Sequence, residues 1–117
     1  MQPPDIIDLP AFEQIKNSMG ADFIGKIVET YCVETPLLLA RLPQALLDSD
    51  YASFRMAVHS IKSASSSLGA LQFAGIAREL EILAREENLA SAAPARVQAL
   101  LAAYPSVAQA LRALCHA

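Results

Sequence analysis

The stretch AVHSIKSASSSLGA, residues 57–70, combines a helical period with small side chains and closes on a glycine. At about 100° per residue, a helix through this stretch has one apolar face. That face contains Phe54, Val58, Ile61, Ser65 and Leu68. We therefore expect a helix from Tyr51 to Leu68, capped by the acidic turn Asp48–Asp50 and ended by Gly69 in a left-handed conformation.

His59 and Lys62 lie off this apolar face, one helical turn apart. Close to His59 on the same face are Ala52, Arg55, Met56, Ser63 and Ser66. An imidazole is a nucleophile near neutral pH because much of it is uncharged, and a neighbouring ammonium can pair with negative charge that reaches the ring. An outward histidine with this surrounding is suited to carry a phosphoryl group.

The same pair is also compatible with an ordinary solvated helix face, the commoner explanation for one histidine and one lysine. The serines of this helix favour a functional role over an ordinary solvated face. Ser63, Ser65, Ser66 and Ser67 lower helix propensity without an obvious gain in packing.

Two helices are expected before this one. Pro10–Ser18 forms a short helix with Asp8 or Leu9 as its cap, and it ends at Gly20. Ala21–Leu47 forms a long helix, in which Pro36 and Pro43 predict a kink or break near Glu34–Thr35. Its apolar stripe is predicted to contain Phe23, Ile27, Tyr31, Leu38, Leu42 and Leu46.

The remaining chain predicts a helix from Leu71 to Asn88, with Glu81 and Arg85 as a supporting pair on its solvent face. NLASAAP, residues 88–94, is expected to be a loop. Pro94 then opens a last helical segment, which Pro105 splits into Ala95–Ala103 and Ser106–Cys115. The expected fold is all-α: one domain, residues 1–117 with a lead-in at 1–8, forming an antiparallel four-helix bundle with a short N-terminal helix.

Composition excludes several classes of protein. With 54% hydrophobic and 18% charged residues in 117, the chain is not disordered, and it has no uninterrupted apolar run long enough to span a membrane. The start MQPPDIIDLP does not have the pattern of a signal peptide. A net charge of −3 without a basic cluster argues against nucleic acid as a partner. Cys32 and Cys115 have no metal-binding or redox spacing, so we expect buried thiols and a cytoplasmic protein.

The residues from His59 to Gly69 resemble the signature of histidine phosphotransfer (HPt) domains. That signature reads His, any residue, an apolar residue, Lys, Gly, small residues, then an apolar residue and Gly. The segments TPLLLARLPQALLDSDYASFRMAVHSIK (Thr35–Lys62) and ARELEILAR (Ala77–Arg85) are also similar to the family. The resemblance covers about two-thirds of the chain.

The resemblance implies a four-helix bundle that carries a phosphoryl group in a two-component phosphorelay. His59 would accept the group from an aspartate of a receiver domain and pass it to another receiver, and Lys62 would support it. The receivers could include those of a hybrid sensor kinase. The chain has no P-loop or glycine-rich nucleotide fingerprint, so we expect a carrier rather than an enzyme. We also expect no cofactor, no metal ion and a monomer.

Ser63 departs from the family pattern, which has Gly at this position. Serine is small, so access to His59 is expected to survive. A docked receiver would contact Ala52, Arg55, Met56, Ser63 and Ser66. For Met56, a place at the edge of the core is an equal alternative.

Two other functions remain as alternatives. The chain could be a helical interaction module that kept the fold without phosphotransfer. It could also bind a metal, although its two histidines and two cysteines share no ligand spacing. His116 is expected to be a frayed terminal residue.

Overall fold

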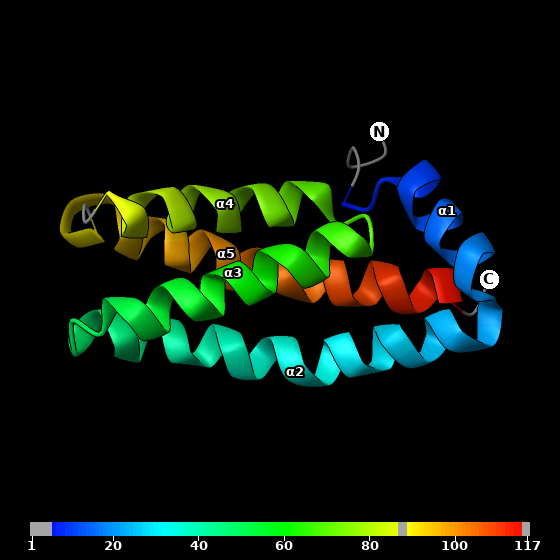
Figure 1. Ribbon diagram of the computed structural model, residues 1–117, viewed down its shortest axis with the longest axis horizontal. Helices are drawn as coiled ribbons and strands as arrows, with labels where there is room; N and C mark the ends of the chain where they lie inside the picture. The colour runs from blue at the N-terminus through cyan, green and yellow to red at the C-terminus, as the bar shows by residue number, and fades with distance from the viewer. Residues whose placement is uncertain (1–5, 87–88, 116–117) are drawn as a thin grey trace.

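The structure, a computed structural model, describes residues 6–86 and 89–115. In this part, the chain forms five helices and no strand: α1 (Leu9–Met19), α2 (Ala21–Leu47), α3 (Tyr51–Ser67), α4 (Leu71–Arg85) and α5 (Leu89–Cys115). Helices α2 to α5 form an antiparallel bundle in which α3 contacts α2 and α4, and α5 contacts the same two helices (Figure 1). Helix α1 lies across one end against α2. The predicted fold class is confirmed.

The helix starts follow the predicted caps. The Asp8 side chain accepts a hydrogen bond from the Ala11 amide at 3.0 Å, and the Asp50 side chain accepts one from the Ser53 amide at 3.2 Å. Both bonds satisfy amides that lack a partner in the first helical turn. The start of α3, and with it the position of His59, is therefore fixed by the acidic turn.

The end of α3 is fixed by Gly69, whose φ is +84°. The Gly69 amide bonds the Ser66 carbonyl and the Ala70 amide bonds the Ser65 carbonyl, as in a Schellman motif. The Gly69 carbonyl also accepts a bond from the Asp8 amide at 2.8 Å. A Cβ at Gly69 would lie 3.0 Å from the Asp8 carbonyl oxygen, so glycine is required both by the conformation and by the close approach of the chain before α1.

A kink or a break was predicted in α2, and the break is wrong, because the helix continues through Pro36 and Pro43. Proline at position 36 cannot donate the usual amide bond to the carbonyl of Cys32. In the structure, that carbonyl accepts a long hydrogen bond from the Tyr104 hydroxyl of α5, at 3.5 Å. Packing of α2 against α3 and α5 holds the helix together where local sequence disfavours it.

The predicted split of the last helix at Pro105 is also wrong, as is the predicted loop at residues 89–94, while Asn88 lies outside the described residues. Helix α5 runs from Leu89 through Pro94 and Pro105 to Cys115. Contacts with both α2 and α4 stabilise it on two sides, which outweighs the local cost of the prolines. The predicted end of α4 at Asn88 lies outside the described residues, and α4 itself ends at Arg85.

The core fills the space between the four bundle helices and the inner face of α1. Its largest fully buried side chains are Phe12, Ile24, Leu42, Phe54, Ile61, Leu68, Leu80, Leu100 and Leu111. The predicted stripe of α3 is confirmed. On α2 the buried face is rotated by about one residue from the prediction: Ile24 is buried while Phe23 is half-exposed.

One polar contact lies inside this core. The Tyr31 hydroxyl of α2 and the Ser65 hydroxyl of α3 are 2.7 Å apart and buried. Burial, the largest cause, raises the pKa of Tyr31 to about 12, so its hydroxyl stays protonated and able to donate. This bond explains why a serine occupies the apolar stripe of α3.

Candidate functional site

His59 stands on the outer face of α3, and its side chain is 59% exposed. Its ring is nevertheless held, because Nδ1 lies 2.6 Å from Oε2 of Glu81 on α4. The Glu81 side chain is only 8% exposed. One side of the imidazole is thus fixed by a buried carboxylate while the rest of the ring faces solvent.

The same carboxylate binds Lys62. Nζ of Lys62 donates to Oε1 of Glu81 at 2.5 Å, so each oxygen of Glu81 has its own partner from α3. His59 and Lys62 lie one turn apart on α3, which lets both reach across to a single residue of α4. The predicted pairing of histidine and lysine on one face is therefore present, with Glu81 as the group that joins them.

Glu81 was missed as a site residue. The expectation that it forms a solvent-facing pair with Arg85 is wrong, because Glu81 belongs to the buried face of α4 with Ala77, Leu80 and Ala84. A spacing of four residues shows that two side chains can meet, but not which way they face. The useful signal was the apolar neighbours at spacings of one, three and four, since an acid on a buried face needs cationic partners.

Electrostatics keep Glu81 ionised. Burial by itself raises the pKa of the Glu81 carboxyl. Hydrogen bonds from Lys62 and His59, together with their charge, outweigh burial and lower this pKa below its usual value of 4.5. A buried negative charge with a donor on each oxygen is the result.

The contact also assigns the tautomer of His59. An ionised carboxylate only accepts hydrogen bonds, so in the neutral imidazole the proton is on Nδ1. The lone pair then resides on Nε2, the nitrogen that does not bond Glu81. A neutral ring whose tautomer leaves the lone pair of Nε2 available is a nucleophile prepared for attack on an electrophilic partner.

The residues predicted to surround His59 all lie on the exposed face of α3: Ala52, Arg55, Met56, Ser63 and Ser66. Met56 is 70% exposed, so it is not a side chain at the edge of the core. The structure brings these residues to one surface around the ring. Arg55 and Met56 have the large side chains of this set, and neither is adjacent in sequence to His59.

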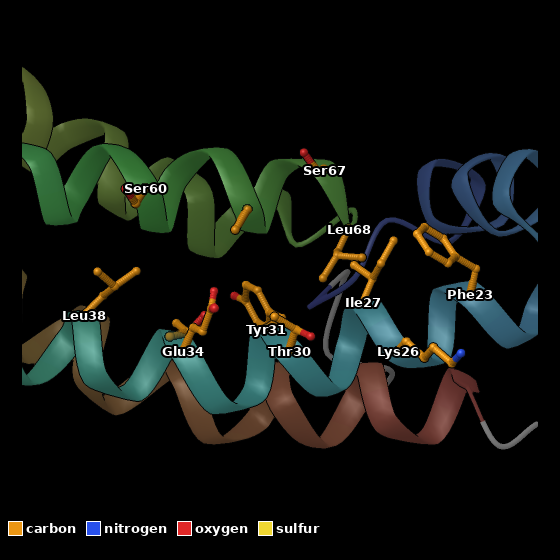
Figure 2. A pocket seen from close by; sticks show the side chains of 12 residues that line it. Phe23, Lys26, Ile27, Thr30, Tyr31, Glu34, Leu38, Ser60, Ser67 and Leu68 are labelled. Atoms are coloured by element: carbon orange, nitrogen blue, oxygen red, sulfur yellow. The ribbon is translucent and has the colours of Figure 1, made fainter.

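A groove lies beside this surface, between α3 and α2 (Figure 2). It has a volume of about 400 Å³, and Ser60, the residue after His59, lines it together with Ala64. Ile27 and Leu38 of α2 form apolar walls, and Phe23 stands at one end. The face of α3 that carries His59 thus continues into an apolar depression on its α2 side.

The remaining candidates play no part in this cluster. Cys32 is buried and Cys115 is partly buried, both as free thiols, and burial raises the pKa of Cys115. Among the described residues, no group of three His, Cys, Asp or Glu side chains could hold a metal ion. His116 lies outside the described residues. In the described part of the chain, none of the helices has the length and apolar character needed to cross a bilayer.

Comparison with known proteins agrees with this fold. The sequence model of the family described as "Hpt domain" matches residues 26–117. The crystal structure of histidine-containing phosphotransfer protein B (HptB) from Pseudomonas aeruginosa PAO1 is similar, with a TM-score of 0.88 and 26% identity. That match covers 97% of this chain and 96% of the HptB chain. No curated protein sequence matches the chain significantly.

Proposed function

Because the chain belongs to the Hpt domain family and is a histidine phosphotransfer carrier of two-component phosphorelays, we propose that His59 is the residue that carries the phosphoryl group. The acceptor atom is Nε2. The observation that carries this assignment is the 2.6 Å contact from Nδ1 of His59 to the buried Glu81 carboxylate, which leaves Nε2 as the available nucleophile on an exposed ring.

Transfer begins with the acyl phosphate on a receiver aspartate. The Nε2 lone pair attacks phosphorus, a P–N bond forms, and the P–O bond to the aspartate breaks, so the aspartate leaves as a carboxylate. The ring keeps its Nδ1 proton and becomes positively charged while it carries the phosphoryl group. Passing the group to another receiver reverses these steps with a new aspartate as the nucleophile.

Glu81 acts on the ring in this scheme. Its carboxylate orients the imidazole through Nδ1 and stabilises the positive charge that develops there, as the buried acid of a catalytic triad does. The transition state of phosphoryl transfer is loose and rich in negative charge, so fixed orientation and charge complementarity supply most of the acceleration. Glu81 is therefore a positioning residue.

Lys62 supports the phosphoryl group. In the unmodified protein its ammonium is held by Glu81 at 2.5 Å, with about a quarter of the side chain exposed. An ammonium at this place can follow the negative charge of an incoming phosphoryl group while remaining close to the ring. In this scheme, the receiver supplies the metal ion and the other charged groups that stabilise the transition state. The chain is therefore a carrier and not an enzyme.

The receiver contacts the exposed face of α3 at Ala52, Arg55, Met56, Ser63 and Ser66. Receivers of a hybrid sensor kinase are among the candidate partners. The cytoplasm is the compartment of transfer, which suits the free thiols Cys32 and Cys115.

Radiolabel transfer from a phosphorylated receiver tests the assignment. Wild-type protein should acquire an acid-labile, base-stable label, as expected for phosphohistidine, and His59→Gln should acquire none while keeping the helical circular dichroism of the bundle. Label on a folded His59→Gln variant would overturn the assignment. A wild-type protein that binds the receiver without accepting label would instead be an interaction module.

A further inference from the structure

The outer face of α2 carries an apolar stripe that no other helix covers in the described residues. Figure 1 shows α2 along one edge of the bundle, with α3 and α5 on its inner side. Val33, Leu37 and Leu47 are 63%, 62% and 79% exposed. Together with exposed Thr30, Ala40 and Gln44, they recur at alternating spacings of three and four residues. We call these six residues the α2 stripe.

A stripe of this spacing is the seam by which one helix packs on another. Single exposed apolar residues are ordinary, but four of them on one face of a helix, Val33, Leu37, Ala40 and Leu47, mark an interaction surface. From Thr30 to Leu47 the stripe spans 18 residues, a length of about 27 Å at 1.5 Å per residue. His59 is held by Glu81 of α4, on the other side of α3 from α2, whereas Thr30 and Gln44 of the stripe line grooves that also contain Ser60 of α3. A partner on the stripe therefore borders the His59 face on its α2 side.

Two charged residues flank the stripe on one edge. Glu34 and Arg41 are exposed and seven residues apart, and neither has a hydrogen-bond or ion-pair partner within the described residues. Other charged residues of the bundle do pair: Glu29 lies 3.6 Å from Arg112, and Glu79 lies 3.0 Å from Arg96. The flank of the stripe therefore offers one unpaired charge of each sign.

We infer that the α2 stripe is a self-association surface, on which a second copy of this chain packs its own α2 in the antiparallel direction. A two-fold axis near the middle of the stripe places Leu37 opposite Ala40 of the second copy. Val33 then faces Gln44, and Thr30 faces Leu47. In two of these three layers a large apolar side chain meets a smaller one, which lets the helices approach.

The same register satisfies the flanking charges. In an antiparallel pair, Glu34 of one copy lies beside Arg41 of the other, and the symmetry makes this contact twice. Exposed ion pairs add little affinity, so their role here is to select the antiparallel register. A parallel pair would place the Glu34 and Arg41 edges of the two copies on opposite sides of the seam, so these charges would not meet. A self-associating chain differs from the monomer expected from the sequence.

The interface is small. One helix face of this length buries less surface than the roughly 800 Å² per partner of a standard interface. The dimer is therefore weak and depends on concentration, a state suited to high local protein concentration rather than to a permanent assembly.

Sedimentation equilibrium from micromolar to millimolar protein tests the inference. Wild-type chain should shift from monomer toward dimer as concentration rises, and Leu37→Asp should stay monomeric. Arg78→Glu is the control, because it changes an exposed arginine of α4, away from the stripe, and should dimerise like the wild type. Circular dichroism establishes that each variant keeps its helices.

The charges give a second, sharper test. Glu34→Arg and Arg41→Glu should each weaken the homodimer, because one variant then presents only positive charges and the other only negative charges at this edge. An equal mixture of the two variants should form a heterodimer at least as readily as the wild type dimerises. A wild-type chain that remains monomeric at millimolar concentration overturns the inference. So does a dimer that is indifferent to Leu37→Asp, or a receiver that binds to the stripe of a monomeric chain.

Discussion

The carboxylate of Glu81 accepts a hydrogen bond from Nδ1 of His59 across the contact between α4 and α3, at 2.6 Å and over 22 residues of sequence. This single contact fixes the tautomer, the orientation and the electrostatic environment of an otherwise exposed imidazole. Lys62 takes the second oxygen of the same carboxylate. The phosphotransfer site proposed for α3 is therefore organised by a residue of another helix.

Replacing Glu81 by glutamine should slow phosphoryl transfer to His59 by at least about tenfold, the effect of losing ~1.4 kcal/mol of transition-state stabilisation. The amide oxygen can still accept from Nδ1, but the negative charge that stabilises the charged ring is lost. Stopped-flow or quench-flow transfer from a receiver measures the rate. Glu79→Gln, on an exposed side chain of the same helix, is the matched control and should transfer normally. Equal rates for the two variants would remove Glu81 from the mechanism.

Glu81 should also make the stability of the bundle depend on pH. Its pKa is lowered in the folded protein from the usual value of 4.5. A lowered pKa means that the unfolded chain binds the proton more readily, so the carboxylate stabilises the fold above pH 4.5 and this contribution is lost as the pH falls through the folded pKa.

Urea unfolding of wild type and Glu81→Gln over a range of pH checks this linkage. The difference in unfolding free energy should persist from neutral pH down to about 4.5 and shrink below that value. A difference that is constant through the acidic range would mean that the contribution of Glu81 does not depend on its charge.

The sequence predicted most of the helices because their signals are local. Asp8, Asp50 and Gly69 act on the backbone within a few residues, and the structure places all three as predicted. The errors have a common origin in tertiary packing. Pro36 and Pro105 disfavour a helix locally, yet α2 and α5 continue through them because each of these helices packs against two neighbouring helices.

The candidate site was predicted only in part for the same reason. The outward direction of His59 and its proximity to Lys62 follow from the period of one helix. The role of Glu81 depends on how α4 is rotated against α3, which no local pattern specifies. Its neighbours Ala77, Leu80 and Ala84 indicated a buried face, and the pairing of buried charge would then have pointed to a cationic partner.

Gly69→Ala should destabilise the bundle by roughly 1–2 kcal/mol, the cost of a left-handed backbone for a residue with a Cβ. The new Cβ would also lie 3.0 Å from the Asp8 carbonyl oxygen and 3.2 Å from the Phe12 amide nitrogen, both backbone atoms. Thermal and chemical unfolding measure the effect. Gly75→Ala is the control, since a Cβ there meets no atom within 4 Å and the helix should gain slightly in stability. Similar losses at both positions would contradict the role of Gly69.

The buried contact between Tyr31 and Ser65 should appear as an interaction energy in a double-mutant cycle. Tyr31→Phe leaves the Ser65 hydroxyl buried without its 2.7 Å partner, which should cost about 1–3 kcal/mol. The double variant Tyr31→Phe/Ser65→Ala removes both polar groups and should be more stable than the sum of the single changes predicts. Strict additivity of the unfolding free energies would show that the two hydroxyls do not depend on each other.

A bulky side chain at Ser63 should separate access to His59 from its chemistry. Ser63 is exposed on α3, four residues after His59 and therefore on the same face. Tryptophan at this position leaves the contacts of Glu81 with His59 and Lys62 in place, because neither involves Ser63. We expect Ser63→Trp to remain folded and to accept phosphate from a small donor such as phosphoramidate at close to the wild-type rate. Transfer from a receiver should be lost, because the indole occupies the space through which the receiver aspartate approaches Nε2.

Ala99→Trp, at an exposed position of α5, controls for the added bulk and should transfer normally. Normal transfer from the receiver to Ser63→Trp would place docking elsewhere on the bundle, and loss of both donors would mean that the substitution disturbs His59 itself.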